Sequence, residues 1–74
     1  MLTEEELFRN FGKNIREFRE EKNMTIEELS LITGIRVSYL KRIEKGLVRR
    51  IKTSHIFIFA EAFHLKPHEI VKSL

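Results

Sequence analysis

With 74 residues, of which 42% are hydrophobic and 34% charged, the chain is long enough for one globular domain (1–74) and too apolar for a disordered tail. It has no cysteine, which excludes disulfides and thiolate metal sites, and its longest apolar run, residues 56–60, is too short to cross a bilayer. The net charge is only +3, but residues 34–52 carry seven basic residues against Glu44 alone, whereas residues 1–33 are net acidic.

The first predicted element is a helix that begins after Thr3. Thr3 and Glu6 have the spacing of a capping box, in which each residue bonds the other's backbone N–H. Apolar side chains then recur at intervals of three and four residues and predict one buried stripe, made of Phe8, Phe11, Ile15 and Phe18. Gly12 within this helix marks a place where another helix could pack closely.

A second helix is predicted at about residues 26–33. Thr25 and Glu28 form another capping box at its start, and Gly34 fits the left-handed conformation that often ends a helix. The apolar side chains that this helix is expected to bury are Leu29 and Ile32.

A third helix is predicted at about Val37 to Lys45, ending at Gly46. Apolar residues recur from the turn before this helix to the residue after Gly46, namely Ile35, Leu40, Ile43 and Leu47, and the last three are expected to face the core. Two helices joined by a turn of three or four residues that contains glycine are typical of a helix-turn-helix.

The fourth and fifth helices follow a basic loop at residues 47–52. Thr53 or Ser54 is the expected cap of the fourth helix, and Pro67 suits the first position of a short fifth helix that ends near Leu74. The fourth helix is expected to bury Ile56, Phe59, Ala60 and Phe63. The sequence therefore predicts an all-α fold of five helices.

Four segments resemble the lambda-repressor-like helix-turn-helix family (Cro/C1 type, XRE family): FGKNIREFREEK, MTIEELSLITGI, SYLKRIEKG and FAEAFHLKPHEI. In this order and spacing the four segments are specific for this family, and the resemblance covers residues 11–72. It implies a compact five-helix domain that dimerises and regulates transcription from palindromic operators. The chain departs from the family pattern at three positions: Ile26 replaces a phosphate-binding glutamine, Arg36 a serine or threonine cap, and Ser30 a small apolar residue.

The resemblance also implies a partly buried ion pair between Arg19 and Glu44. This pair would tie the first helix to the third and hold the third helix in place without contacting DNA.

One face of the third helix is expected to read DNA. At 100° per residue, the polar side chains of this helix fall opposite its apolar side and carry only basic or neutral groups. In family-like docking the residues that would meet base edges are Val37, Ser38, Lys41 and Arg42, of which Arg42 could bond guanine through two hydrogen bonds. Lys41 and Arg36 could serve either bases or phosphates. The remaining basic residues of this region are expected at phosphates or in a minor groove, and they are Arg36, Lys45, Arg49, Arg50 and Lys52.

Helices four and five carry more apolar surface than one small core needs. This excess predicts a homodimer whose interface consists of Phe57, Ile58, Ile70, Val71 and Leu74. The competing explanation is that the fifth helix covers the core of its own chain.

The function that these patterns favour is a sequence-specific regulator of transcription, a repressor, that binds double-stranded DNA. No nucleophile with a base at a recognisable spacing and no glycine-rich phosphate loop appears, so neither an enzyme nor a cofactor is expected. The alternative is a protein-interaction helix-turn-helix, as in bacterial cell-shape proteins that bind a cytoskeletal filament. Among DNA-binding regulators, the sequence fits a phage repressor, a restriction–modification controller and an antitoxin with a toxin partner.

The N-terminus is acidic and unlike a signal peptide, which predicts a cytoplasmic protein without membrane contact.

Overall fold

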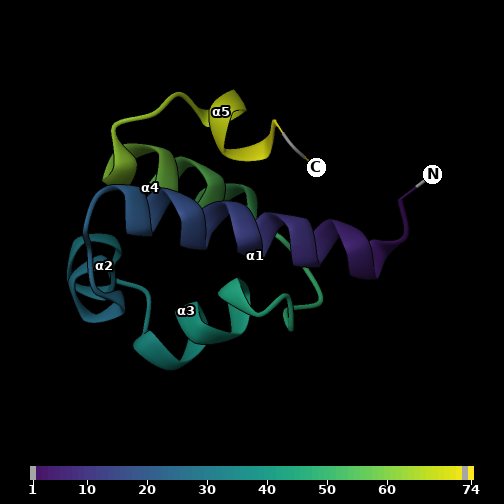
Figure 1. Cartoon of the computed structure of the whole chain (residues 1–74), viewed down its shortest axis with the longest axis horizontal. Coiled ribbons are helices and arrows are strands. Elements are labelled where there is room, and N and C mark those ends of the chain that lie inside the picture. Colours follow the sequence, from purple (N-terminus) through teal and green to yellow (C-terminus); the bar gives the residue numbers. More distant parts are fainter. Residues whose placement is uncertain (1, 73) are drawn as a thin grey trace.

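The structure is a computed structural model that describes residues 2–72 and 74. The described residues form five helices and no strand, which confirms the predicted all-α fold, and the helices are α1 (Glu4–Glu21), α2 (Ile26–Thr33), α3 (Val37–Glu44), α4 (Thr53–Phe63) and α5 (Pro67–Val71). In Figure 1, α1 crosses the middle of the molecule, with α3 on one side of it and α4 and α5 on the other. None of the helices described is long and apolar enough to cross a membrane.

Local sequence features set most of the helix boundaries. Both predicted capping boxes form, with Thr3 bonded to Glu6 and Thr25 bonded to Glu28. Three predicted boundaries were wrong by a few residues. Residue 53 is the first residue of α4 instead of its cap, α3 ends one residue early, and α5 ends at residue 71 instead of near residue 74. The ends of such short helices depend on tertiary contacts more than on local propensity.

The core lies between α1, α3, α4 and α5, with one contribution from α2. Its fully buried large side chains are Phe11, Ile15, Leu29, Leu40, Ile43, Phe59, Phe63 and Ile70. Two residues predicted to be buried are instead 59% exposed, Ile32 and Leu47. The eight-residue α2 packs through Leu29 and leaves Ile32 at its edge. The left-handed backbone at residue 46 redirects the chain, so that Val48, which is 5% exposed, enters the core instead of Leu47.

Two glycines allow α3 to pack closely against α1. A Cβ at Gly12 would overlap the carbonyl oxygen of Ile43 and lie 2.9 Å from that of Glu44. Just beyond α3, a Cβ at Gly46 would lie 2.8 Å from Cα of Arg9. The backbone at the end of α3 therefore rests directly on α1, and Gly12 has the packing role that the sequence suggested.

The close contact at Gly12 predicts that Gly12→Ala destabilises the domain, although alanine is the better helix former. Alanine would add up to about 1 kcal/mol of helix propensity. Its methyl group meets backbone carbonyls that cannot move independently, and such overpacking costs about 1–3 kcal/mol. We expect a net loss in the free energy of unfolding, measured by urea denaturation. Lys13→Ala, at the neighbouring exposed position, is the control and should change stability by less than about 0.5 kcal/mol.

Candidate nucleic-acid interface

The third helix presents two chemically different sides. Leu40 and Ile43 are 0% and 2% exposed and hold the helix to the core. The polar positions predicted to read DNA are exposed, namely Ser38, Lys41, Arg42 and Lys45, whereas Val37 is half-buried at the margin. Within the described part of the chain these four polar side chains make no hydrogen bond or ion pair that would occupy them. The outward side of α3 is therefore free to contact a ligand.

The turn between α2 and α3 is held by side-chain hydroxyl groups. The Ser30 hydroxyl donates to the carbonyl oxygen of Ile35 at 2.6 Å, and the Thr33 hydroxyl donates to that of Leu29 at 2.8 Å. The Ile35 amide in turn donates to the Thr33 hydroxyl at 3.2 Å, and Gly34 adopts a φ of +75°. Ser30 departs from the family pattern, and sequence reasoning gave it no role. Its hydroxyl bonds α2 to the turn residue Ile35, two residues before α3 begins.

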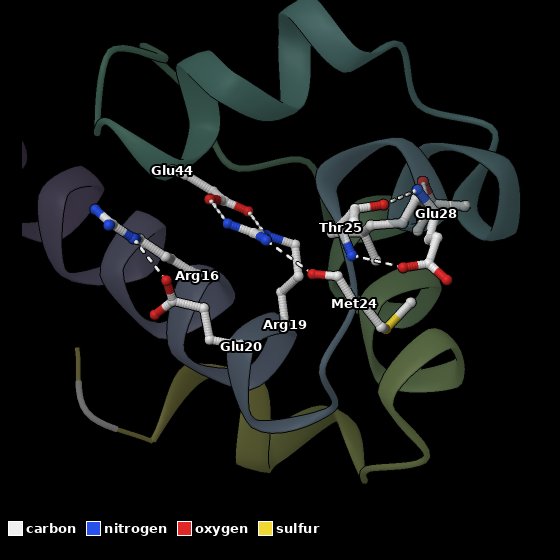
Figure 2. A network of polar contacts seen from close by, with 9 residues as sticks. Arg16, Arg19, Glu20, Met24, Thr25, Glu28 and Glu44 are labelled. Carbon is white, nitrogen blue, oxygen red and sulfur yellow. Dashed lines mark hydrogen bonds and ion pairs between the residues drawn. The ribbon is translucent and has the colours of Figure 1, made fainter.

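Arg19 and Glu44 form the ion pair that the family resemblance implies (Figure 2). Nε and Nη2 of Arg19 donate to the two carboxylate oxygens of Glu44 at 2.8 and 3.0 Å, and Nη1 donates to the carbonyl oxygen of Met24 at 2.9 Å. The two side chains are 16% and 7% exposed. The hydrogen bond from Glu44 raises the pKa of Arg19 above its ordinary value. One guanidinium group thus connects α1, the loop after it and the last residue of α3.

The loop after the third helix extends the basic surface. Val48 is buried and Ile51 is half-buried, so these two side chains anchor the loop to the core. Between and beside the anchors, the basic side chains predicted to bind phosphates are all exposed: Arg49, Arg50 and Lys52. Arg36, at the start of α3, is also exposed and forms no side-chain cap. The structure therefore leaves this whole group accessible around the outward side of α3.

Tyr39 and His55 connect the third helix to the fourth. The ring centroids of Tyr39 and His55 lie 5.7 Å apart, and those of His55 and Phe59 lie 6.3 Å apart, both in edge-to-face arrangements. Partial burial and the nearby Lys52 lower the pKa of His55, which favours the neutral ring. Sequence reasoning assigned no packing role to His55, because nothing in its spacing indicates that it meets a side chain of the preceding helix.

The apolar residues predicted to form a dimer interface do not share one exposed surface. Phe57 is 57% exposed, whereas the side chains of Ile58, Val71 and Leu74 are half-buried and pack against the core. Ile70 is fully buried, so the expectation that it contacts a second copy was wrong. The short α5 covers the core of its own chain, which was the competing explanation.

The arrangement of the ion pair predicts that Glu44→Gln destabilises the domain strongly. Glutamine keeps the shape of the side chain but leaves the partly buried guanidinium group of Arg19 without a counter-charge. Breaking a fully buried ion pair in this way costs about 3–5 kcal/mol, so the loss here should approach the lower end of that range, which is still a large part of the stability of a small domain. Thermal and urea denaturation would measure the loss.

The control is the same substitution in an exposed pair of α1. Glu20 accepts from Arg16 at 3.4 Å, and the side chains of this pair are 54% and 62% exposed (Figure 2). Glu20→Gln should therefore cost less than about 1 kcal/mol. Equal losses in the two variants would contradict the anchoring role of Glu44.

Comparison with known proteins agrees with this geometry. A family model described as helix-turn-helix matches residues 15–70. Among solved structures, the chain is similar to the restriction-modification controller protein C.AhdI from Aeromonas hydrophila, with 30% sequence identity and a TM-score of 0.79 over 85% of this chain and 94% of that chain. A search of curated proteins found no match. Because the family match spans most of the chain, this protein belongs to the Cro/C1-type helix-turn-helix family and is a DNA-binding transcriptional regulator, not an enzyme.

Proposed function

We propose that this regulator binds a palindromic operator as a homodimer and represses transcription from it. The observation that carries the proposal is the outward side of α3, which is exposed and carries only basic or neutral groups. The Arg19–Glu44 ion pair fixes this side relative to the rest of the domain. A rigid helix with such a surface suits the major groove, and two of them related by a two-fold axis suit an inverted repeat.

Within this interface, we assign base reading to the first two turns of α3. Arg42 offers a planar fork that matches the two acceptors of guanine, Ser38 can donate or accept, and Val37 can pack on a thymine methyl group. Lys41 lies on the same exposed side and would support them at a base or a phosphate. The phosphate contacts fall to the surrounding basic residues, which are Arg36, Lys45, Arg49, Arg50 and Lys52.

The likeness to a restriction-modification controller favours one regulatory class over the others that fit the sequence. At 30% identity over most of both chains, the relationship extends beyond the fold alone. We therefore prefer a restriction–modification controller to a phage repressor or an antitoxin with a toxin partner. A promoter carrying an inverted repeat beside restriction and modification genes is the DNA that the protein should bind.

The basic loop after α3 predicts a change in the salt dependence of DNA binding. Replacing Arg49 and Arg50 by alanine should weaken binding to every sequence. It should also reduce the slope of log affinity against log salt concentration by about one for each phosphate that the variant no longer neutralises. Titrations at several salt concentrations measure both effects.

The matched control removes two positive charges from the opposite side of the molecule. Lys66 and Lys72 are exposed and lie beside α5, across α1 from α3 (Figure 1). Their double alanine variant should keep the wild-type slope. An unchanged slope in the Arg49/Arg50 variant would remove this loop from the interface.

The assigned role of Arg42 predicts a loss of sequence preference on substitution. Arg42→Ala should cost about 1–3 kcal/mol on the operator and relax the preference at one base pair in each half-site. Arg42→Lys should also lose discrimination, because an ammonium group cannot reproduce two parallel hydrogen bonds. Selection of binding sites from random duplexes, at one fixed salt concentration, would compare both variants with the wild type.

Two outcomes of this selection would contradict parts of the proposal. Identical preferred sequences for all three proteins would show that Arg42 contacts only the backbone, leaving Ser38 and Val37 as the main readers. Selected sites without an inverted repeat would contradict dimeric binding to a palindromic operator.

A further inference from the structure

A group of basic side chains surrounds a hollow between α1 and α3, beside the outward side of α3. The hollow has a volume of about 150 Å³, and α1, the start of α2 and the end of α3 all contribute to it. The residues that line it are Arg16, Arg19, Ile26, Lys41, Glu44 and Lys45. Only one of these side chains is acidic, so the hollow is positively charged.

The positive charge of the hollow is not neutralised within the described part of the fold. The carboxylate of Glu44 is occupied by its two hydrogen bonds with Arg19 (Figure 2). Lys41 and Lys45 are exposed and form no ion pair among the residues described. They are four residues apart, a spacing at which like charges destabilise a helix. Binding of an anion in the hollow would relieve this repulsion.

Arg16 is the remaining basic side chain of the hollow, and it lies one turn before Arg19 on α1 (Figure 2). Its Nε donates to Oε2 of Glu20 at 3.4 Å, in a pair whose side chains are 62% and 54% exposed. An exposed ion pair of this kind contributes little to stability. By contrast, an arginine can bind a phosphate through two parallel charge-assisted hydrogen bonds. A phosphate in the hollow can therefore displace Glu20 from Arg16 at little cost.

We propose that this hollow binds a phosphate of the DNA backbone, with Arg16, Lys41 and Lys45 as the residues that hold it. The inference rests on the docking of α3 proposed above, and it adds α1 to the interface. It also assigns Lys41 to a phosphate, where the proposed function alone allows either a base or a phosphate.

The position of the hollow favours the backbone of the duplex that α3 enters. A helix in the major groove has a sugar-phosphate backbone along each edge of the groove. Lys41 and Lys45 line the hollow from α3 and the residue after it, whereas Arg16 lines it from α1. The strand that passes between the outward side of α3 and α1 would therefore bring its phosphates to all three cations.

The same geometry makes Glu20 a competitor for Arg16. A phosphate that binds Arg16 has to displace the Glu20 carboxylate from its Nε. Removal of this carboxylate should therefore tighten DNA binding, but only while Arg16 is present. This dependence separates a direct contact from the general effect of removing one negative charge from a DNA-binding protein.

The first test compares the affinities of full-length variants for the operator duplex that the site selection recovers, at several salt concentrations. Arg16→Ala should bind about three- to tenfold more weakly, and its slope of log affinity against log salt concentration should fall by about one for each bound subunit. Lys13→Ala is the matched control, since it removes an exposed positive charge of α1 that lies outside the hollow. It should keep the wild-type slope.

The second test is a double-mutant cycle between Arg16 and Glu20. Glu20→Gln should bind the operator about two- to fivefold more tightly than the wild type, because Arg16 is no longer held away from the phosphate. In an Arg16→Ala background the same substitution should have no such effect. Glu17→Gln is the control, because it removes an exposed carboxylate of α1 that lies outside the hollow, and its effect should not depend on Arg16.

A third measurement locates the contact on the DNA. Each phosphate that flanks a half-site is replaced in turn by an uncharged methylphosphonate. One of these replacements should weaken binding of the wild type and leave that of Arg16→Ala unchanged, because the substitution and the replacement remove the same contact.

Each result distinguishes this inference from the proposed function. Wild-type affinity and slope in Arg16→Ala, together with operator binding by the wild type, would overturn the phosphate site and leave the proposed function intact. An Arg16→Ala defect that persists with every methylphosphonate duplex would also overturn the site, since the effect would then act at long range. A wild type that binds no duplex would overturn both. Circular dichroism would confirm that Arg16→Ala is folded, and Arg16→Gln would replace it if it is not.

Discussion

The orientation of α3 depends on one guanidinium group. An eight-residue helix is too short to be stable alone, so α3 takes its direction from the contacts at its ends and along its apolar side. Arg19 supplies the contact at the last residue of α3 through two hydrogen bonds to Glu44. It also donates to the carbonyl oxygen of Met24 and so fixes the loop between α1 and α2. An ion pair that is largely shielded from water adds little stability compared with an apolar pair of the same size. Its directional bonds instead determine where the outward side of α3 points.

Two other constraints complete the position of α3. The hydroxyl group of Ser30 crosses the turn before α3, and the missing side chain of Gly12 lets the end of α3 rest on α1. The position of α3 is thus fixed before its first residue by the bond of Ser30, along its length by the buried Leu40, and at its end by Gly12 and the ion pair. A shift of one turn or a rotation would break a directional hydrogen bond or create a backbone clash, which explains how so small a domain can hold the outward side of α3 rigidly.

The features that the sequence predicted well depend only on residues close to one another in the chain. Capping boxes and the 100° periodicity locate the helices and separate the outward side of α3 from its core side. The errors have tertiary causes. Ile32 is exposed because no element covers that edge of α2, and Leu47 is exposed because the left-handed turn at Gly46 redirects the chain. Ile70 is buried because α5 folds back on the core, and the bond of Ser30 exists only once the turn has formed. In each case the outcome depends on which distant residues pack against the side chain, and no fixed spacing in the sequence indicates those contacts.

The separation between side chains that hold α3 and side chains that would read DNA has a consequence for specificity. Ser38, Lys41 and Arg42 are exposed and make no hydrogen bond within the described residues, so substitutions there should change stability by less than about 0.5 kcal/mol. The anchoring pair consists of Glu44 at the end of α3 and Arg19 on α1, and its two charges neutralise each other within the fold. If α3 reads DNA as proposed, the preferred operator sequence can change through the outward residues alone, while the ion pair keeps the angle of α3 to the rest of the domain fixed. Such a domain could acquire a new operator without being selected again for its fold.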